Sequence, residues 1–273
     1  MKLDITEEML FALLRSALHG THADATIFAG ITSEAWQECY RLSVRQGVMA
    51  LAWDGLITLP TELQPPKSLK INWWLAVERC EKKYRYYCRV ISDLSTFYAT
   101  HGITAVQLKG VGFANNYPIP SHREGGDIDI FTYSADSSGL SDREANSLAD
   151  KLMRGRGIEV DFSHSQKHSM FYYKGIPIEN HKKFLNTEIY RTAVSMDILL
   201  RKLLRPRLTV LDGKYEVLTP SPDFNTVFLA FHSAQHYALG FAMHHLCDWA
   251  CLLKKQGPVS YTHLRAHETS QDL

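Results

Sequence analysis

Two aspartates separated by a single apolar residue occur in the stretch REGGDIDIF, residues 123–131. The neighbouring Ile128 and Ile130 favour a β-strand, in which side chains two positions apart point to the same face. Asp127 and Asp129 therefore leave the predicted strand on one side. Like charges this close repel each other unless a cation lies between them, and a divalent metal ion is the usual solution. The stretch predicts half of a metal site.

The hydrophobic period changes near residue 100, and this change divides the chain. Before it, apolar residues recur at helical intervals, with Ser33 as the expected cap of one helix and Pro65-Pro66 at the start of a long one. The expected buried stripe of the long helix consists of Trp73, Val77, Cys80, Tyr84, Ile91, Leu94 and Tyr98. A helical N-terminal region is therefore predicted over residues 1–100.

Shorter elements are expected after residue 103. The patterns predict strands over 103–109, 127–132, 158–163, 168–174 and 176–182, and helices over 110–116, 141–155 and 221–255. Ser141 with Glu144 has the capping-box spacing, and Gly175 marks an antiparallel hairpin. This order predicts an α+β fold, in which a sheet core over 101–187 is followed by a C-terminal helical region over 188–257.

Composition limits the classes of function. Lys and Arg number 30 against 29 Asp and Glu, so the net charge of +1 provides no global field for nucleic acid. Five cysteines without CxxC spacing are typical of reduced thiols in the cytosol. No run reaches the roughly 18 apolar residues of a membrane span. A cytoplasmic protein that acts on neither membranes nor nucleic acids is expected.

The C-terminal segment differs from the rest. VSYTHLRAHET, residues 259–269, resembles the translation of a transposase-type sequencing adapter. We therefore treat residues 258–273 as an artefactual tail and leave them out of the fold prediction. The expectation that follows is a native sequence continuing past about Gly257.

A third carboxylate can join the aspartate pair. In the strand predicted over 176–182, Glu179 shares one face with Pro177 and His181. Three carboxylates on a sheet are the ligands of a two-metal nucleotidyl-transfer site. Upstream, Gly110 and Gly112 allow the backbone to approach phosphates.

These motifs lead to a family. LKGVGFANNYPIP, REGGDIDIF and IPIENHKKF occur in an order that resembles the uncharacterised bacterial nucleotidyltransferase family of the DNA polymerase beta superfamily. The resemblance is loose over residues 85–255 and specific over 105–185. It implies a nucleotidyltransferase-type mixed sheet core and an enzyme dependent on Mg²⁺ or Mn²⁺. Such an enzyme moves a nucleoside monophosphate from an NTP to a hydroxyl acceptor, here an unknown small molecule or protein.

The resemblance also implies roles for single residues. Asp127 and Asp129 would be shared metal ligands, and Glu179 would bind the catalytic metal or accept the acceptor's proton. Lys109 and Arg123 are candidates for contacts with the triphosphate. The complete set of candidate nucleotide-binding residues is Lys109, Gly110, Gly112, Arg123, Gly126, His168 and His181.

Alternative interpretations of single residues remain open. Lys109 and Arg123 can be ion-pair partners, and His168 and His181 can be half-buried structural histidines. His232 and His236 have a spacing that can bind zinc, although a role in acceptor binding or helix packing is the simpler interpretation. The role of Asp248 is equally open.

Alternative functions also remain. An isolated D-x-D can be a turn or the metal motif of a glycosyltransferase, but about a hundred helical residues precede it here, where such an enzyme has a nucleotide-binding α/β unit. An inactive nucleotide-binding relative, or a partner in a toxin–antitoxin-type system, is the second alternative. Three intact carboxylates argue against it.

Overall fold

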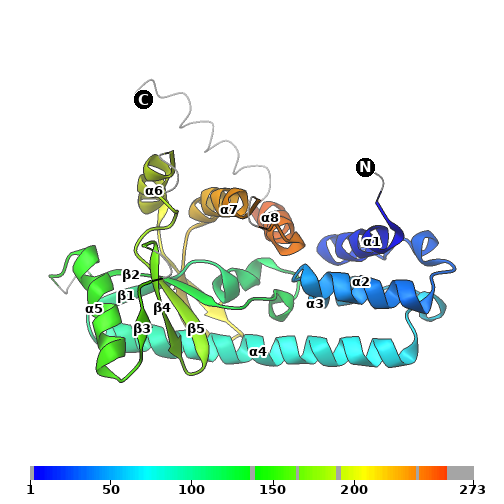
Figure 1. The fold of residues 1–273 in the computed structure, drawn as a ribbon, viewed down its shortest axis with the longest axis horizontal. Helices are drawn as coiled ribbons and strands as arrows, with labels where there is room; N and C mark the ends of the chain where they lie inside the picture. Colours follow the sequence, from blue (N-terminus) through cyan, green and yellow to red (C-terminus); the bar gives the residue numbers. More distant parts are fainter. Residues whose placement is uncertain (1–2, 136–138, 164–165, 189–191, 238–239, 257–273) are drawn as a thin grey trace.

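The structure is a computed structural model that describes residues 3–135, 139–163, 166–188, 192–237 and 240–256. One long helix, α4 (Lys67–Ala99), runs along the molecule beneath a group of helices at one end and a β-sheet at the other (Figure 1). The adapter-like segment expected at residues 259–269 lies outside the described residues.

Helices precede residue 100 and the strands begin at residue 103, as the change of period predicts. The other α-helices are α1 (Ile5–His19), α2 (Ser33–Arg45), α3 (Met49–Leu56), α5 (Asp142–Gly155), α6 (Thr192–Leu203), α7 (Pro222–Tyr237) and α8 (Met243–Gln256). The strands are β1 (Ile103–Gln107), β2 (Ile128–Ser134), β3 (Val160–Asp161), β4 (His168–Tyr173), β5 (Ile176–His181), β6 (Arg207–Leu211) and β7 (Tyr215–Thr219). The 3₁₀ helices are η1 (Ala25–Phe28), η2 (Thr61–Leu63), η3 (Gly110–Asn116) and η4 (Pro120–His122).

The sheet has seven strands in the order β3-β4-β5-β2-β1-β7-β6. β2 pairs in parallel with β5, β1 pairs in parallel with β7, and the remaining pairs are antiparallel. This mixed sheet with flanking helices confirms the α+β prediction. The β6–β7 hairpin was not predicted, although it extends the sheet beyond β1.

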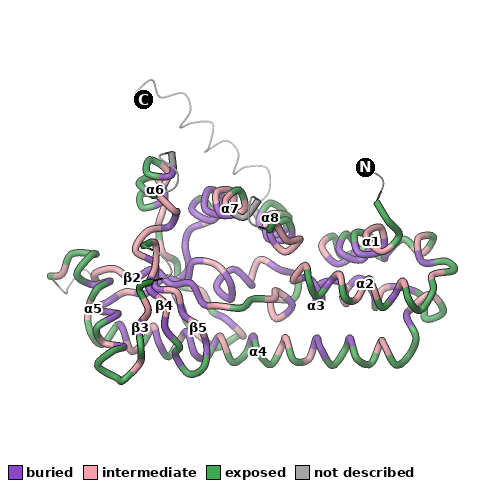
Figure 2. The backbone as a smooth tube through the Cα atoms, in the orientation of Figure 1, coloured by how far each residue is buried: buried purple, intermediate pink, exposed green. Residues whose placement is uncertain are grey.

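Helix α4 contributes to two hydrophobic cores, and buried and exposed residues alternate along it (Figure 2). In its first half the Trp73 ring contacts Tyr40 on α2 and Trp53 on α3, and the indole N–H donates to the carbonyl of Met49 (2.9 Å). In its second half Tyr98 belongs to a core that residues of the sheet and of α5 complete. The predicted stripe is buried except for Cys80, which is half-buried. Among the described residues, no helix is long and apolar enough to cross a bilayer.

The opposite face of the sheet carries a third core beneath α6 and α7. Aromatic rings dominate it: Phe184 lies 4.6 Å from Phe131 and 4.9 Å from Phe224, measured between ring centroids. The sheet is therefore covered on both faces around β2 and β5.

Helix caps and the β4–β5 turn follow mostly from local sequence. Ser141 and Glu144 form the predicted capping box of α5. Lys174 and Gly175 both have positive φ angles (51° and 78°), as a two-residue hairpin requires. The cap of α2 was wrongly predicted: the Thr32 side chain accepts the N–H of Ala35, so the helix is capped one residue earlier than expected.

A buried polar network fixes β5 against its neighbours. Asn180 accepts from the Thr132 hydroxyl (2.8 Å) and donates to Asp150 on α5 (2.9 Å). Asn146 donates to Asn180 (3.1 Å), and Ser169 donates to Asp150 (2.7 Å). Because each of these buried groups would be costly to leave unpaired, a one-residue slip of β5 is strongly disfavoured. The network thus positions Glu179 and His181, on either side of Asn180.

A buried histidine joins η4 to the helices below it. The His122 ring lies 2.8 Å (Nδ1) from Asp54 on α3 and 3.2 Å (Nε2) from Glu81 on α4. Burial alone would lower the pKa of His122, but the bonds and charges of both carboxylates outweigh it and raise the pKa above its ordinary value.

His122 is expected to make stability depend on pH. A raised folded-state pKa adds stability that is fully present below the unfolded value of about 6.5 and is lost as pH rises through the folded value. The difference in unfolding free energy between wild type and His122→Gln should therefore shrink as pH rises above about 6.5. Urea unfolding across this range measures it. A difference that stays constant with pH would contradict the charged state of His122.

Candidate active site

Three carboxylates converge on two neighbouring strands. Asp127 directly precedes β2, Asp129 is the second residue of β2, and Glu179 on β5 is the register partner of Asp129. One ligand oxygen from each lies within 4.8 Å of the other two. The predicted placement of Glu179 beside the aspartates is confirmed, and its catalytic role stays a prediction.

Asp129 is the buried anchor of this cluster. Its side chain is 0% exposed, with Lys109 Nζ 3.3 Å from Oδ2 and His181 Nε2 2.9 Å from Oδ1. Burial alone would raise the pKa of Asp129, but the Lys109 charge and the His181 bond outweigh it and hold the pKa well below its usual range. Asp129 is therefore an ionised carboxylate with a partner on each oxygen.

Asp127 has the opposite electrostatic position. Burial and the neighbouring Asp129 charge raise its pKa, and Lys109 offsets this only in part. Repulsion within the cluster is thus concentrated on Asp127, where a cation would relieve it. The three donors are carboxylate oxygens, which Mg²⁺ and Mn²⁺ prefer, so the residues present fit such an ion.

Lys167, which the sequence analysis missed, also faces the cluster. It lies just before β4, and its charge interacts with those of Asp129, Glu179 and Lys109. Burial, followed by the like charge of Lys109, lowers the pKa of Lys167. No local motif marks this lysine, because only the β4–β5 hairpin brings it to the carboxylates.

The stretch REGGD, residues 123–127, is a loop held by helices on two sides. Glu124 Oε1 accepts the backbone N–H of Ala50 (3.0 Å) in the first turn of α3, which has no side-chain cap of its own. Lys83 and Tyr87 on α4 donate to the carbonyls of the two loop glycines (2.6 and 3.0 Å). The N-terminal helices therefore set the position of the loop that leads into Asp127.

Arg123 is anchored to α8. Its Nε and Nη2 donate to the two oxygens of Asp248 (3.0 and 2.8 Å), and the Tyr117 hydroxyl donates to Asp248 Oδ1 (2.7 Å). The Arg123 and Asp248 side chains are only 7% and 4% exposed. Asp248 thus has a structural partner, and the expected triphosphate contact of Arg123 stays a prediction.

The predicted phosphate-approach glycines have different surroundings. Gly110 has φ of +63°, the left-handed conformation that favours glycine, at the start of η3. A Cβ on Gly112 would lie 2.3 Å from the Gln107 side chain, so this glycine is required for packing. A Cβ on Gly126 would meet nothing within 4 Å. Of the three, Gly110 and Gly126 border the cavity beside the carboxylates.

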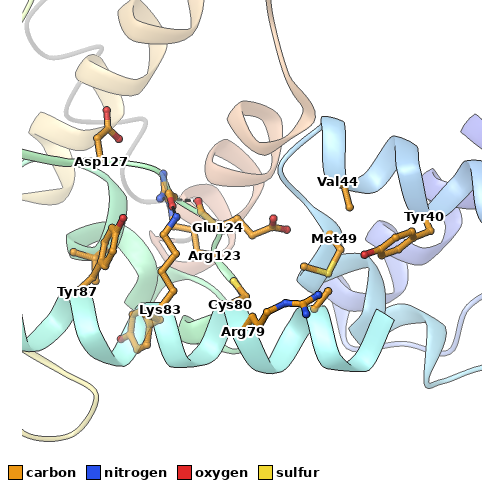
Figure 3. A pocket seen from close by; sticks show the side chains of 14 residues that line it. Tyr40, Val44, Met49, Arg79, Cys80, Lys83, Tyr87, Arg123, Glu124 and Asp127 are labelled. Atoms are coloured by element: carbon orange, nitrogen blue, oxygen red, sulfur yellow. Dashed lines mark hydrogen bonds between the residues drawn. The ribbon is translucent and has the colours of Figure 1, made fainter. Parts of the chain in front are cut away.

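Two cavities meet at the REGGD loop and share Asp127. The first, of about 330 Å³, reaches the carboxylates and α8 and is lined by Lys109, Gly110, Arg123, Gly126, Asp127, Asp129, His232, His244, His245 and Asp248, among others. The second, of about 370 Å³, extends along α4 from Asp127 and Tyr87 to Tyr40 and Met49 (Figure 3). Asp127 therefore lies where a ligand in one cavity can meet a ligand in the other.

The first cavity has a polar wall that the sequence analysis found only in part. His232 was singled out, but His244 and His245 at the start of α8 were not. Burial lowers the pKa of both, which makes them neutral N–H donors near pH 7. The His236 side chain lies outside the described residues.

The comparisons with known proteins show the family of the chain. The family described as uncharacterised nucleotidyltransferase matches residues 32–268, and the chain belongs to this family. The match includes most of the segment that resembles an adapter. A solved structure, an antigenic nucleotidyltransferase-like protein from Paracoccidioides brasiliensis, is similar with a TM-score of 0.39 and 13% identity over 60% of this chain and 74% of that chain. No curated protein matches the chain.

Proposed function

We propose that this protein is an enzyme, dependent on Mg²⁺ or Mn²⁺, that transfers a nucleoside monophosphate from an NTP to a hydroxyl acceptor in the cytoplasm. The observation that carries the proposal is the group of three carboxylates beside two cavities that share Asp127. Family membership supports the same reaction class. Five free cysteines support the cytoplasmic setting.

Asp127, Asp129 and Glu179 would hold the metal ions. Bound there, the ions supply charge neutralisation at the phosphates and activation of the acceptor hydroxyl. The protein's own groups do the rest. Lys109 places a positive charge beside the carboxylates, and the histidines of the 330 Å³ cavity offer N–H donors to the triphosphate.

The cavity along α4 is the proposed site for the acceptor. It is lined by apolar and aromatic side chains such as Tyr40, Met49 and Val111, with the cations Arg79 and Lys83 at its α4 wall (Figure 3). Among the described residues that line it, the one carboxylate besides Asp127 is Glu124, which caps α3. The acceptor class that suits this cavity is a compact hydroxyl compound with an apolar body and an anionic group.

Pyrophosphate release tests the reaction. The protein, Mg²⁺ and each labelled NTP are incubated with fractions of a metabolite pool, and one fraction is expected to give a labelled product. Glu179→Gln is expected to lower kcat by about 10²–10⁴-fold while NTP affinity largely survives, because the substitution keeps the shape but removes the charge. The control is Glu159→Gln, at an exposed position. Full turnover in Glu179→Gln would exclude the proposed role.

Arg79→Met tests the acceptor site. Loss of one charge-assisted contact is expected to raise KM for the acceptor by about 10-fold or more, with KM for the NTP unchanged. Lys82→Met, on the same helix but outside the cavity lining, is the matched control. An effect on the NTP instead would assign this cavity to the nucleotide.

A further inference from the structure

A second group of metal-binding side chains adjoins the three carboxylates. His168 on β4 is the cross-strand partner of His181 on β5, and Glu179 lies two positions before His181. All three side chains therefore project from the same face of the hairpin. One ligand atom from each lies within 4.8 Å of the other two.

The separations between these atoms match the edges of a coordination shell. His181 Nε2 lies 3.4 Å from Glu179 Oε2 and 2.9 Å from Asp129 Oδ1, and His168 Nδ1 lies 3.5 Å from Glu179 Oε2. A cation with ligands at about 2.0–2.2 Å has neighbouring ligand atoms about 2.9–3.5 Å apart. One cation can thus contact the atoms of His168, Glu179 and His181, which all lie within 4.8 Å of one another.

The ring nitrogens are arranged for metal binding. His181 Nδ1 lies 3.2 Å from the carbonyl of Lys183, which can only accept a hydrogen bond. With Nδ1 donating to this carbonyl, Nε2 faces the carboxylates of Asp129 and Glu179, where a cation can take the place of a proton. His168 Nδ1 is buried and has no hydrogen-bond partner among the described residues.

We propose that His168, His181 and Glu179 bind a divalent transition-metal cation such as Zn²⁺. Two imidazole nitrogens favour Zn²⁺, Co²⁺ or Ni²⁺ over Mg²⁺, which prefers oxygen ligands. Glu179 is shared with the oxygen-only site at Asp127 and Asp129, so two cations of different chemistry lie side by side. This site does not depend on the proposed reaction.

Cobalt is the probe, because Co²⁺ occupies zinc sites and absorbs visible light. The full chain is stripped with EDTA, saturated with Mg²⁺ and titrated with Co²⁺. One equivalent is expected to bind with a visible absorption band, and Zn²⁺ is expected to displace it. X-ray absorption of the Zn²⁺ form is expected to show two imidazole ligands.

His168→Asn is the main variant, because His168 is partly exposed and its replacement leaves the buried His181 in place. It should weaken Co²⁺ binding by more than the roughly 10–100-fold that loss of an outer-shell partner costs. Asp127→Asn should leave the band unchanged, and His19→Ala, at an exposed position on α1, controls for adventitious histidine binding.

Three results would overturn the site. The first is the absence of Co²⁺ binding in excess Mg²⁺, the second is Co²⁺ binding that His168→Asn does not weaken, and the third is a Zn²⁺ coordination shell of oxygen ligands alone. Because the experiment measures cation binding, a negative result does not bear on the proposed nucleotidyl transfer. In the same way, a protein without transferase activity can still bind this cation.

Discussion

Asp127→Asn and Asp129→Asn are each expected to abolish nucleotidyl transfer but to change stability in opposite directions. Each variant removes a carboxylate that would hold the metal ions. Several kcal/mol of transition-state stabilisation are lost, and at about 4 kcal/mol this is about a 10³-fold fall in kcat/KM. The two aspartates differ in what their charges do without metal.

Asp129→Asn leaves Lys109 buried without its ion-pair partner, a change that costs about 3–5 kcal/mol for a buried pair. Asp127→Asn removes the charge on which repulsion is concentrated, so the metal-free protein should become more stable. Repulsion between the two aspartates would by itself predict that neutralising either one stabilises the protein. The ion pair with Lys109 corrects this for Asp129.

Urea unfolding in EDTA, together with pyrophosphate release in Mg²⁺, separates the two effects. Asp161→Asn, between α5 and β4, serves as a control for an aspartate of the same sheet outside the cluster. If the free energy of unfolding changes in the same direction in both variants, the difference between a paired Asp129 and a repelled Asp127 is contradicted. Retained transfer in either variant would remove that residue from the metal site.

Asp248→Ala is expected to destabilise the protein by about 3–5 kcal/mol, because it leaves the buried Arg123 guanidinium unpaired. For a chain of this size the fall in Tm is about 10 °C. The double variant Arg123→Leu/Asp248→Leu should recover most of this loss, because neither buried charge remains. Glu38→Ala, which breaks an exposed pair with Arg41, should cost less than about 1 kcal/mol.

The same variants separate two roles of Arg123. If Arg123 also contacts the triphosphate, the double variant regains stability but not NTP affinity, as calorimetry with a non-hydrolysable NTP would measure. If the double variant regains both stability and NTP affinity, Arg123 only holds the REGGD loop to α8. A loss below about 1 kcal/mol in Asp248→Ala would contradict the buried pair altogether.

Local sequence was sufficient for the parts of the site that depend on strand alternation. Asp127 and Asp129 follow from the pattern around Ile128, and Glu179 follows from the alternation in β5, because a side-chain period of two leaves few choices. The β6–β7 hairpin was not predicted, although its two antiparallel strands are joined by a tight turn at Gly213. Nothing in that segment indicates its parallel pairing with β1.

The partners of charged residues could not be predicted, because they come from segments far apart in the chain. Arg123 meets Asp248, Glu124 meets the first turn of α3, and Lys167 reaches the carboxylates only through the hairpin. A single sequence contains no signal for such long-range contacts. Motifs thus located the chemistry of the site, and the tertiary fold determined which charges are neutralised.

Helix α4 also limits how the protein can move. Its 33 residues include no proline or glycine, the usual points at which helices kink, and they form a rod about 50 Å long. Each end is built into a different hydrophobic core. A hinge rotation between the N-terminal helices and the sheet would have to bend this rod or expose one of the cores. Ligands of the two cavities are therefore expected to enter and leave past loops and side chains, and not through a rotation of the N-terminal helices against the sheet.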